Sequence, residues 1–336
     1  MEIVTFIMPA YNAEKFISKS IQSLLNQNSD AWKLICIDDG STDNTLDIIQ
    51  KYCESDKRIS IIQQENKGPA VARALAISKV QTKYLAILDS DDLLSKDYVL
   101  KILSKAKETD ADIIMPDVHI IDEKDNIISK ASHFINNNIN PNTTITNNLN
   151  AFQLSITWRL HGWILMKTNL AQIYYTENDV SYSKFNSDEF ITRKLYLKAK
   201  SVTFTSATYY YRNNNYSLTR TRSLKHFDAL LTYEKLISLC EIEHICPSIM
   251  HIIFKRYRSC INLMSYVNKL EFNNQKKDFI ASSYLFYKKH FNYDIFKEIS
   301  FTEKTKYHIS LLGFNVINGI ATIKYIIAKL SKSINS

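Results

Sequence analysis

Residues 84–92 read Tyr84-Leu85-Ala86-Ile87-Leu88-Asp89-Ser90-Asp91-Asp92, an apolar run that ends directly in carboxylates. Five consecutive apolar residues with polar flanks are typical of a buried β-strand. Asp89 and Asp91 are spaced i, i+2, so on an extended strand end both carboxylates face the same side. Such a pair could meet one hard cation, and Mg²⁺ or Mn²⁺ suits oxygen ligands of this kind.

A simpler interpretation is that Asp91 and Asp92 cap the following helix, and for this motif alone capping is the stronger interpretation. Two more acids, Asp38 and Asp39, follow the strand expected over 33–38. Carboxylates that converge repel one another unless a cation or a bound ligand compensates. The combination therefore favours a binding site.

Outward from this stretch, residues 2 to about 120 alternate short β-rich runs with segments of helical period. The strands are expected over 2–8, 33–38, 59–63, 84–88 and 112–115, and the helices over 14–27, 43–55, 70–79 and 96–108. This alternation is typical of a mostly parallel sheet covered by helices, in which ligands bind outside the carboxyl ends of the strands. Polar clusters follow three of the strands: Pro9-Ala10-Tyr11-Asn12, Asp38-Asp39-Gly40-Ser41 and Asp89-Ser90-Asp91-Asp92. We expect them along one edge.

Several classes of protein are disfavoured. The chain has neither a G-x-G-x-x-G nor a G-x-x-x-x-G-K-[ST] loop, which argues against the usual dinucleotide site and against a P-loop. Five cysteines without regular spacing argue against a disulfide framework and for a reducing compartment. The first residues lack the features of a signal peptide, and no apolar run is long enough to predict a spanning helix. We therefore expect a cytoplasmic protein.

The C-terminal third differs from the rest of the chain. The formal net charge is +8, and nearly all of the basic excess lies in residues 225–336, which have a helical pattern throughout. The Asn-rich stretch 136–150 is expected to form a loop. We place a domain boundary near 222, which predicts a catalytic domain over 1–222 and a basic helical region over 223–336.

Four motifs, taken in order, resemble those of family 2 glycosyltransferases. They are Pro9-Ala10-Tyr11-Asn12, Asp38-Asp39-Gly40-Ser41-Thr42-Asp43, Asn66-Lys67-Gly68 with Arg73, and Asp89-Ser90-Asp91-Asp92. The resemblance implies the GT-A fold, which is Rossmann-like α/β with a mostly parallel central sheet, here followed by an α-helical C-terminal region. It also implies transfer from a nucleotide sugar with inversion at the anomeric carbon.

Carried over by position, the resemblance implies a role for each motif. Pro9 and Tyr11 would flank a uracil base, with Ala10 beside them, and Asp39 would accept the N–H of the base. Asp38, Gly68 and Ser90 would line the nucleotide sugar, and Arg73 would face the diphosphate. Asp91 would bind Mn²⁺ or Mg²⁺ directly, and Asp89 would contact the metal, a metal-bound water or the ribose.

An inverting transfer also needs a base that takes the proton of the acceptor hydroxyl. The family places it in an acidic pair that opens a helix before a Tyr-rich strand, and Ser187-Asp188-Glu189 resembles that pair with Ser187 in place of the first acid. We expect Asp188 to be the base, with Glu189 as the alternative. A helix start with favourable N-terminal acids explains the same residues without catalysis.

Two further groups of residues are expected near the substrates. Trp158, His161 and Trp163 lie where the family has acceptor-side residues. Sugars stack on indoles, so one of the two Trp side chains could be a platform for the acceptor. A buried structural role is the alternative for each residue. Arg212 and Arg220 could fold over the diphosphate, or belong to a solvated loop.

The basic tail has two interpretations, which the sequence leaves equal. Segments 252–258 and 323–330 mix aromatic, aliphatic and basic residues as helices at an anionic membrane do, at the inner face of the cytoplasmic membrane. The alternative is an ordinary helical bundle. No nucleic-acid-binding motif is present and residues 1–224 are nearly neutral, so we expect no nucleic-acid partner.

Together these features predict a metal-dependent inverting enzyme that moves a hexosyl or N-acetylhexosaminyl group from a UDP-sugar to an acceptor. The acceptor would be a glycan or lipid-linked oligosaccharide of capsule, O-antigen or lipooligosaccharide synthesis. The alternative is a sugar-nucleotide-binding scaffold without catalysis, which the altered acid pair at Ser187-Asp188 motivates.

Overall fold

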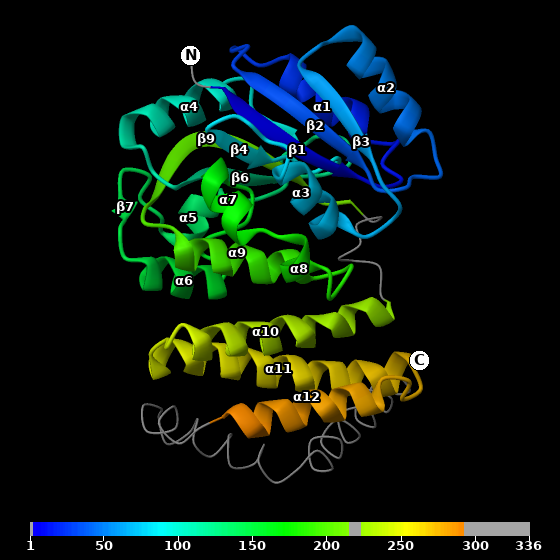
Figure 1. The fold of residues 1–336 in the computed structure, drawn as a ribbon, viewed down its shortest axis with the longest axis vertical. Coiled ribbons are helices and arrows are strands. Elements are labelled where there is room, and N and C mark those ends of the chain that lie inside the picture. The colour runs from blue at the N-terminus through cyan, green and yellow to red at the C-terminus, as the bar shows by residue number, and fades with distance from the viewer. Residues whose placement is uncertain (1–2, 215–222, 292–336) are drawn as a thin grey trace. The chain divides into compact units, whose positions relative to one another are not determined.

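A computed structural model describes residues 3–214 and 223–291. By their internal contacts the residues form two compact units, Met1–Thr221 and Arg222–Ser336. Figure 1 shows that β-strands belong to the first unit and that the described part of the second unit is helical.

The described part of the first unit holds a nine-stranded sheet in the order β3-β2-β1-β4-β8-β6-β9-β5, with β7 beside β9. The strands are β1 (Val4–Ala10), β2 (Trp32–Asp38), β3 (Ile59–Gln63), β4 (Tyr84–Ile87), β5 (Leu93–Leu94), β6 (Ile113–Ile121), β7 (Thr144–Ile145), β8 (Leu165–Lys167) and β9 (Val202–Arg212). Strands β3, β2, β1 and β4 are parallel neighbours, as are β6 and β9. Strand β8 runs antiparallel between β4 and β6. The expected α/β architecture with a mostly parallel centre is confirmed.

Helices follow the strands as the hydrophobic pattern predicts. They are α1 (Ile17–Leu25), α2 (Thr45–Ser55), α3 (Pro69–Ile77), α4 (Tyr98–Thr109), α5 (His133–Asn137), α6 (Asn148–Ile156), α7 (Thr168–Tyr174), α8 (Glu177–Val180) and α9 (Ser187–Lys198). The first four agree with the expected helices to within a few residues at each end. Helix α3 begins at Pro69 directly after Gly68, because Pro is well suited to the first helical position.

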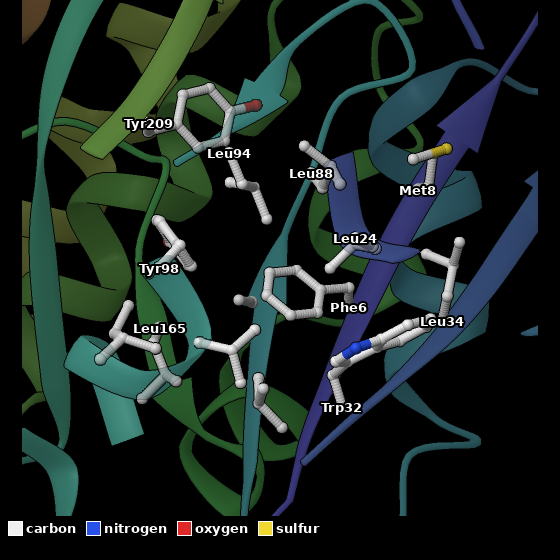
Figure 2. Packing of buried hydrophobic residues seen from close by; sticks show 14 of the residues in the cluster. Phe6, Met8, Leu24, Trp32, Leu34, Leu88, Leu94, Tyr98, Leu165 and Tyr209 are labelled. Carbon is white, nitrogen blue, oxygen red and sulfur yellow. The ribbon is translucent and has the colours of Figure 1, made fainter. Parts of the chain in front are cut away.

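One hydrophobic cluster of the first unit lies between the sheet and helices α1, α2 and α4. Alternate residues of β1, Phe6 and Met8 among them, are fully buried on this face together with Leu24 of α1 and Tyr98 of α4 (Figure 2). Because β1 is buried along its whole length, it is a central strand, and the loops at its carboxyl end are held by a rigid base.

The Asn-rich stretch is not the long loop that the composition predicts. Helix α5 ends within it at Asn137, and the next residue, Asn138, has the left-handed conformation (φ +51°) that Asn tolerates. The side chain of Asn147 then accepts a hydrogen bond from the backbone of Asn150, 3.0 Å away, and caps α6. Several of these asparagines thus start and stop short elements.

The second unit comprises the 3₁₀ helix η1 (Leu224–Asp228) and helices α10 (Ala229–Ile242), α11 (Pro247–Glu271) and α12 (Lys277–His290). In segment 252–258, for which the sequence leaves a membrane interface and a helical bundle equal, Ile253, Phe254 and Tyr257 are fully buried. The Tyr257 hydroxyl donates to Glu234 and to the Ser283 carbonyl, at 2.6 and 2.8 Å. This segment therefore packs as part of a helical bundle. The other segment, 323–330, lies outside the described residues.

Over residues 3–214 and 223–291, no helix combines the length and the apolar character needed to cross a lipid bilayer.

Candidate active site

The carboxyl ends of β1, β2 and β4 form one edge of the sheet, which we call the rim. The parallel register places Ala10 beside Asp38, and the Asp39 backbone N–H donates to the Ala10 carbonyl at 2.8 Å. Strand β4 lies on the other side of β1 and leads into Asp89. The three predicted polar clusters therefore meet at one edge, as expected for a sheet of this topology.

The first cluster presents an exposed aromatic side chain over a rigid strand end. Pro9 and Ala10 are buried in β1, whereas Tyr11 is 45% exposed. Asn12 follows in the left-handed conformation, and its side-chain oxygen accepts from the Thr42 backbone N–H at 2.8 Å. This bond joins the loop after β1 to the loop after β2, and Tyr11 stays available to a planar ligand.

Asp39 is almost fully buried and holds the loop before α3. One of its oxygens accepts from Gln64 Nε2 and the Lys67 backbone N–H, at 2.6 and 2.8 Å, and the other accepts from the Gly68 backbone N–H at 2.8 Å. A carboxylate has about four acceptor positions, so one is left for a ligand. Asp38, also buried, accepts a longer bond of 3.3 Å from the Ser41 N–H.

Gly68 occupies a position that a side chain would disturb. Its φ is +93°, and an added Cβ would lie 3.0 Å from the Cα of Lys184. The segment before α9 therefore rests directly on the loop that Asp39 holds. The close approach explains a glycine here in a chain that has only five.

Arg73 connects two acids that lie far apart in the sequence. Its guanidinium is buried and donates to Asp89 at 2.6 Å and to Asp188 at 3.1 Å. Burial alone would lower the pKa of Arg73, but Asp89, Tyr175 and Asp188 raise it well above the ordinary value, so the side chain stays charged. The predicted diphosphate contact and the predicted base thus belong to one cluster, which we call the Arg73 cluster: Arg73, Asp89 and Asp188.

Asp89 has both carboxylate oxygens engaged within the protein. One accepts from Arg73, and the other accepts from the indole N–H of Trp163 at 3.1 Å. The Trp163 ring in turn packs against Tyr209 and Tyr211. Sequence reasoning expected Trp163 on the acceptor side; the structure shows it partly buried, as a support of Asp89.

Asp91 and Asp92 have different surroundings although they are neighbours. Burial, and then the charge of Asp89, raise the pKa of Asp91 to about 6. One Asp91 oxygen accepts from the side-chain amide of Asn214 at 2.5 Å. Asp92 is fully buried and accepts from the Tyr209 hydroxyl and the Arg212 backbone N–H, each at 2.7 Å. Asp92 is therefore a structural support, whereas Asp91 is only partly buried at the same turn.

Arg212 does not lie over the rim. It is fully buried; its Nε donates to the Asp91 carbonyl at 2.6 Å and its guanidinium pairs with Asp125 at 2.6 Å. The predicted diphosphate contact is thus replaced by a support beneath the 89–92 turn. Ser90 is fixed from the other side, because its carbonyl accepts from the Ser20 hydroxyl at 2.9 Å. Arg220 lies outside the described residues.

The two candidate bases at the start of α9 differ in exposure and partners. The Asp188 side chain is 38% exposed and contacts Arg73. Glu189 is more buried and pairs with Arg193, and burial raises its pKa to about 7. Ser187 is buried, and its hydroxyl donates to the Ser183 carbonyl. Asp188 therefore faces the cluster, while Glu189 is tied into the helix.

The remaining acceptor-side candidates also separate. His161 is buried with its Nε2 3.0 Å from the Pro116 carbonyl, so this nitrogen carries the proton, and burial lowers the pKa of the ring to about 3. His161 therefore has a structural role. Trp158, in contrast, is 46% exposed and remains available to a ligand.

A divalent cation at the rim would need phosphate oxygens of a bound ligand in addition to the carboxylates of the protein. Among residues 3–214 and 223–291, no three His, Cys, Asp or Glu side chains gather as a metal site. Each Asp89 oxygen accepts one hydrogen bond within the protein and keeps one further acceptor position, so Asp89 and Asp91 can both donate oxygen ligands. Burial is the main cause of the raised pKa of Asp91. Mg²⁺ characteristically takes one or two carboxylates together with phosphate oxygens.

Sequence reasoning missed Asn214, Tyr209 and Arg193. Tyr209 lies near the end of β9 and Asn214 lies two residues after that strand. Both contact the 89–92 turn from more than a hundred residues away. The alternation of the Tyr-rich strand 209–212 could have indicated that Tyr209 and Tyr211 share a face. No local signal marks Asn214.

Comparison with known proteins agrees with the geometry. A family model described as "Glycosyl transferase family 2" matches residues 5–170. Glycosyltransferase GlyG of Streptococcus pneumoniae is 26% identical over 281 residues, which cover 81% of this chain and 90% of GlyG. The putative teichuronic acid biosynthesis glycosyltransferase TuaG of Bacillus subtilis is 44% identical over 102 residues, which cover 30% of this chain and 40% of TuaG.

Among solved structures, S. aureus TarS 1-349 in complex with UDP-GlcNAc superposes with a TM-score of 0.73 at 19% identity. The match covers 98% of this chain and 92% of that one. At this level of identity the likeness establishes the fold.

Proposed function

The chain belongs to the family 2 glycosyltransferases, and on that premise we propose that it moves a hexose or N-acetylhexosamine from a UDP-sugar to a hydroxyl of a bacterial surface glycan, with inversion. The observation that carries the proposal is the Arg73 cluster, because one buried cation joins a rim carboxylate to the candidate base. The name of TuaG and the ligand of TarS support the substrate class.

We assign donor binding to the rim. The exposed ring of Tyr11 offers a stacking surface for the uracil, and the remaining acceptor position of Asp39 can take the base's N–H. An aromatic face and one acceptor suffice to recognise a pyrimidine edge. Asp39 also accepts from the backbone at Lys67 and Gly68, so one carboxylate would hold both the bound base and the loop 64–68.

Asp188 acts as the base in this proposal. It projects from the first turn of α9, a rigid element, and its Arg73 contact fixes the carboxylate. The carboxylate takes the proton as the acceptor oxygen attacks the anomeric carbon and the bond to the diphosphate breaks. Glu189 is less suited, because its oxygens are turned to Arg193.

Asp91 would hold Mn²⁺ or Mg²⁺ together with the donor's phosphates. A bound cation would act as a Lewis acid that neutralises the charge of the departing diphosphate. Arg73 supplies fixed positive charge near the same edge of the sheet, and Asn214 orients the Asp91 carboxylate.

The test is incubation with labelled UDP-sugars, Mn²⁺ and a panel of saccharide acceptors. We expect transfer, or slow donor hydrolysis where no acceptor suits. Absence of both across the panel would reject the enzyme. Retained UDP binding in such an inactive protein would instead favour the scaffold alternative.

A further inference from the structure

Trp158 combines an unfavourable backbone with an exposed ring. Its φ is +63°, the left-handed region that bulky side chains rarely adopt, and yet the side chain is 46% exposed. An indole that stays exposed does not gain the large favourable free energy of burying its apolar surface. Backbone strain persists only where the surroundings enforce it, and it concentrates at ligand-binding positions.

The surroundings of Trp158 enforce its position from two sides. Its backbone N–H donates to the Ser155 carbonyl at the end of α6, at 3.0 Å. Four residues on, Gly162 lies against α9 so closely that an added Cβ would be 3.0 Å from Thr192 Oγ1. The turn that presents Trp158 is therefore fixed to the same helix that carries Asp188.

One face of the Trp158 ring is covered by a cation of that helix. The Arg193 guanidinium carbon lies 4.5 Å from the ring centroid, and Arg193 is almost fully buried and paired with Glu189. The exposed area of the indole consequently belongs to the opposite face and the edge. Because Glu189 neighbours Asp188, the platform and the candidate base are connected through two contacts on α9.

We propose that the free face of Trp158 is the platform on which a pyranose ring of the acceptor stacks, so the acceptor is a cyclic saccharide and not an open-chain polyol phosphate. The proposal rests on the transferase function given above. The C–H face of a pyranose is flat and apolar and matches an indole, whereas a polyol has no such face. Arg193, the cation that lies against the ring, is almost fully buried and its guanidinium is turned to Glu189, so it presents no accessible charge to a phosphate.

Fluorescence tests the platform without turnover. Of the three tryptophans in the chain, Trp32 is buried and Trp163 is partly buried, so Trp158 should dominate quenching by acrylamide. We expect at least one disaccharide from a set built of glucose, galactose and N-acetylglucosamine to protect Trp158 from acrylamide quenching, and the protection should saturate with disaccharide concentration. Ribitol 5-phosphate should give no protection.

Kinetics with Trp158→Asn tests the role in transfer. Asn tolerates the left-handed region, so this variant removes the aromatic face without adding strain, and its melting temperature should not fall. We expect the KM for the saccharide acceptor to rise about tenfold, as for loss of one aromatic contact. The loss should appear in KM more than in kcat, and Trp158→Phe should restore part of the affinity. Leu100→Asn, at an exposed position of α4, is the matched control.

Two outcomes overturn the platform: an unchanged saccharide KM in Trp158→Asn, or transfer to ribitol 5-phosphate in preference to saccharides. A parent that hydrolyses the donor while no disaccharide of the set protects Trp158 rejects the platform and leaves the transferase intact. Protection of Trp158 in a protein that neither hydrolyses nor binds UDP-sugars would support the saccharide site and reject the transferase.

Discussion

At the scale of single residues, Arg73 explains how two carboxylates from distant positions tolerate each other. Asp89 and Asp188 both contact its guanidinium, which is buried and remains charged. Without that cation the two acids would repel one another in a partly desolvated site. The residue is thus required for the site to assemble, whichever substrate it binds.

The first prediction concerns the base. Asp188→Asn keeps the size of the side chain and one acceptor for Arg73 but cannot take a proton, so transfer kcat should fall on the order of 10²- to 10⁴-fold. UDP binding, followed by calorimetry, should stay within a factor of about three. Glu189→Gln is the matched variant and should keep most of the activity. Loss in Glu189→Gln with activity retained in Asp188→Asn would exchange the two roles.

The second prediction concerns pH. Burial raises the pKa of Glu189 from 4.5 to about 7, so between these values the folded protein binds a proton that the unfolded chain has released. Its contribution to the free energy of unfolding is therefore present below about pH 4.5 and is lost as the pH rises to about 7.

Glu189→Gln should flatten the dependence of the melting temperature on pH in this window. Glu108→Gln, whose side chain is 64% exposed on α4, should leave the parent's dependence unchanged. An identical pH profile for the parent and Glu189→Gln would show that Glu189 titrates normally.

At the scale of elements, the end of β9 supports the turn that follows β4. Tyr209 and the Arg212 backbone hold Asp92, the Arg212 side chain holds the Asp91 carbonyl, and Asn214 holds the Asp91 carboxylate. The guanidinium of Arg212 also reaches Asp125 in the turn after β6. Two separate segments thus hold the turn that carries Asp91.

The third prediction tests this support. Asp125→Asn removes the charge that balances the buried Arg212, and Asn tolerates the left-handed φ of +71° at this position. Breaking such a pair should lower the free energy of unfolding by on the order of 2–4 kcal/mol, measured by urea denaturation.

Glu123→Gln is the control from the same turn. Its partner Lys15 has a half-exposed side chain, whereas Arg212 is fully buried, so the loss should be below about 1 kcal/mol. Equal losses for the two variants would mean that Asp125 does not neutralise Arg212.

At the scale of the whole molecule, the chain has two compact units with different contents. All three tryptophans, Trp32, Trp158 and Trp163, lie in the first unit. Tryptophan fluorescence therefore reports on the first unit, whereas the far-ultraviolet circular dichroism also reports on helices α10, α11 and α12.

The fourth prediction uses this difference. A ligand that binds only the folded first unit stabilises it by mass action, by about 2.7 kcal/mol at a hundredfold excess over Kd. UDP with Mn²⁺ should therefore raise the melting temperature seen by fluorescence. A melting temperature that stays the same at a hundredfold excess of UDP over Kd would contradict binding to the folded first unit.

Much of the fold could be predicted from the sequence because its signals are local. The strands expected over 33–38, 59–63 and 84–88 agree with β2, β3 and β4 to within a residue at each end. Binary patterning carries this information, since a buried strand needs consecutive apolar residues wherever it lies in the chain. The Asn-rich stretch was less predictable, because Asn favours caps and loops alike.

The sequence by itself determined the order of the elements, the meeting of Pro9–Asn12, Asp38–Asp39 and Asp89–Asp92 at one edge, and the family resemblance. Parallel strands end at one edge whatever their side chains, so the topology was enough. Only the tertiary structure decided that Arg73 joins Asp89 to Asp188, that Arg212 is buried, and that Trp163 supports the site while Trp158 faces outward. Those outcomes depend on which distant residue compensates each charge and covers each ring, and no local pattern records a contact across a hundred residues.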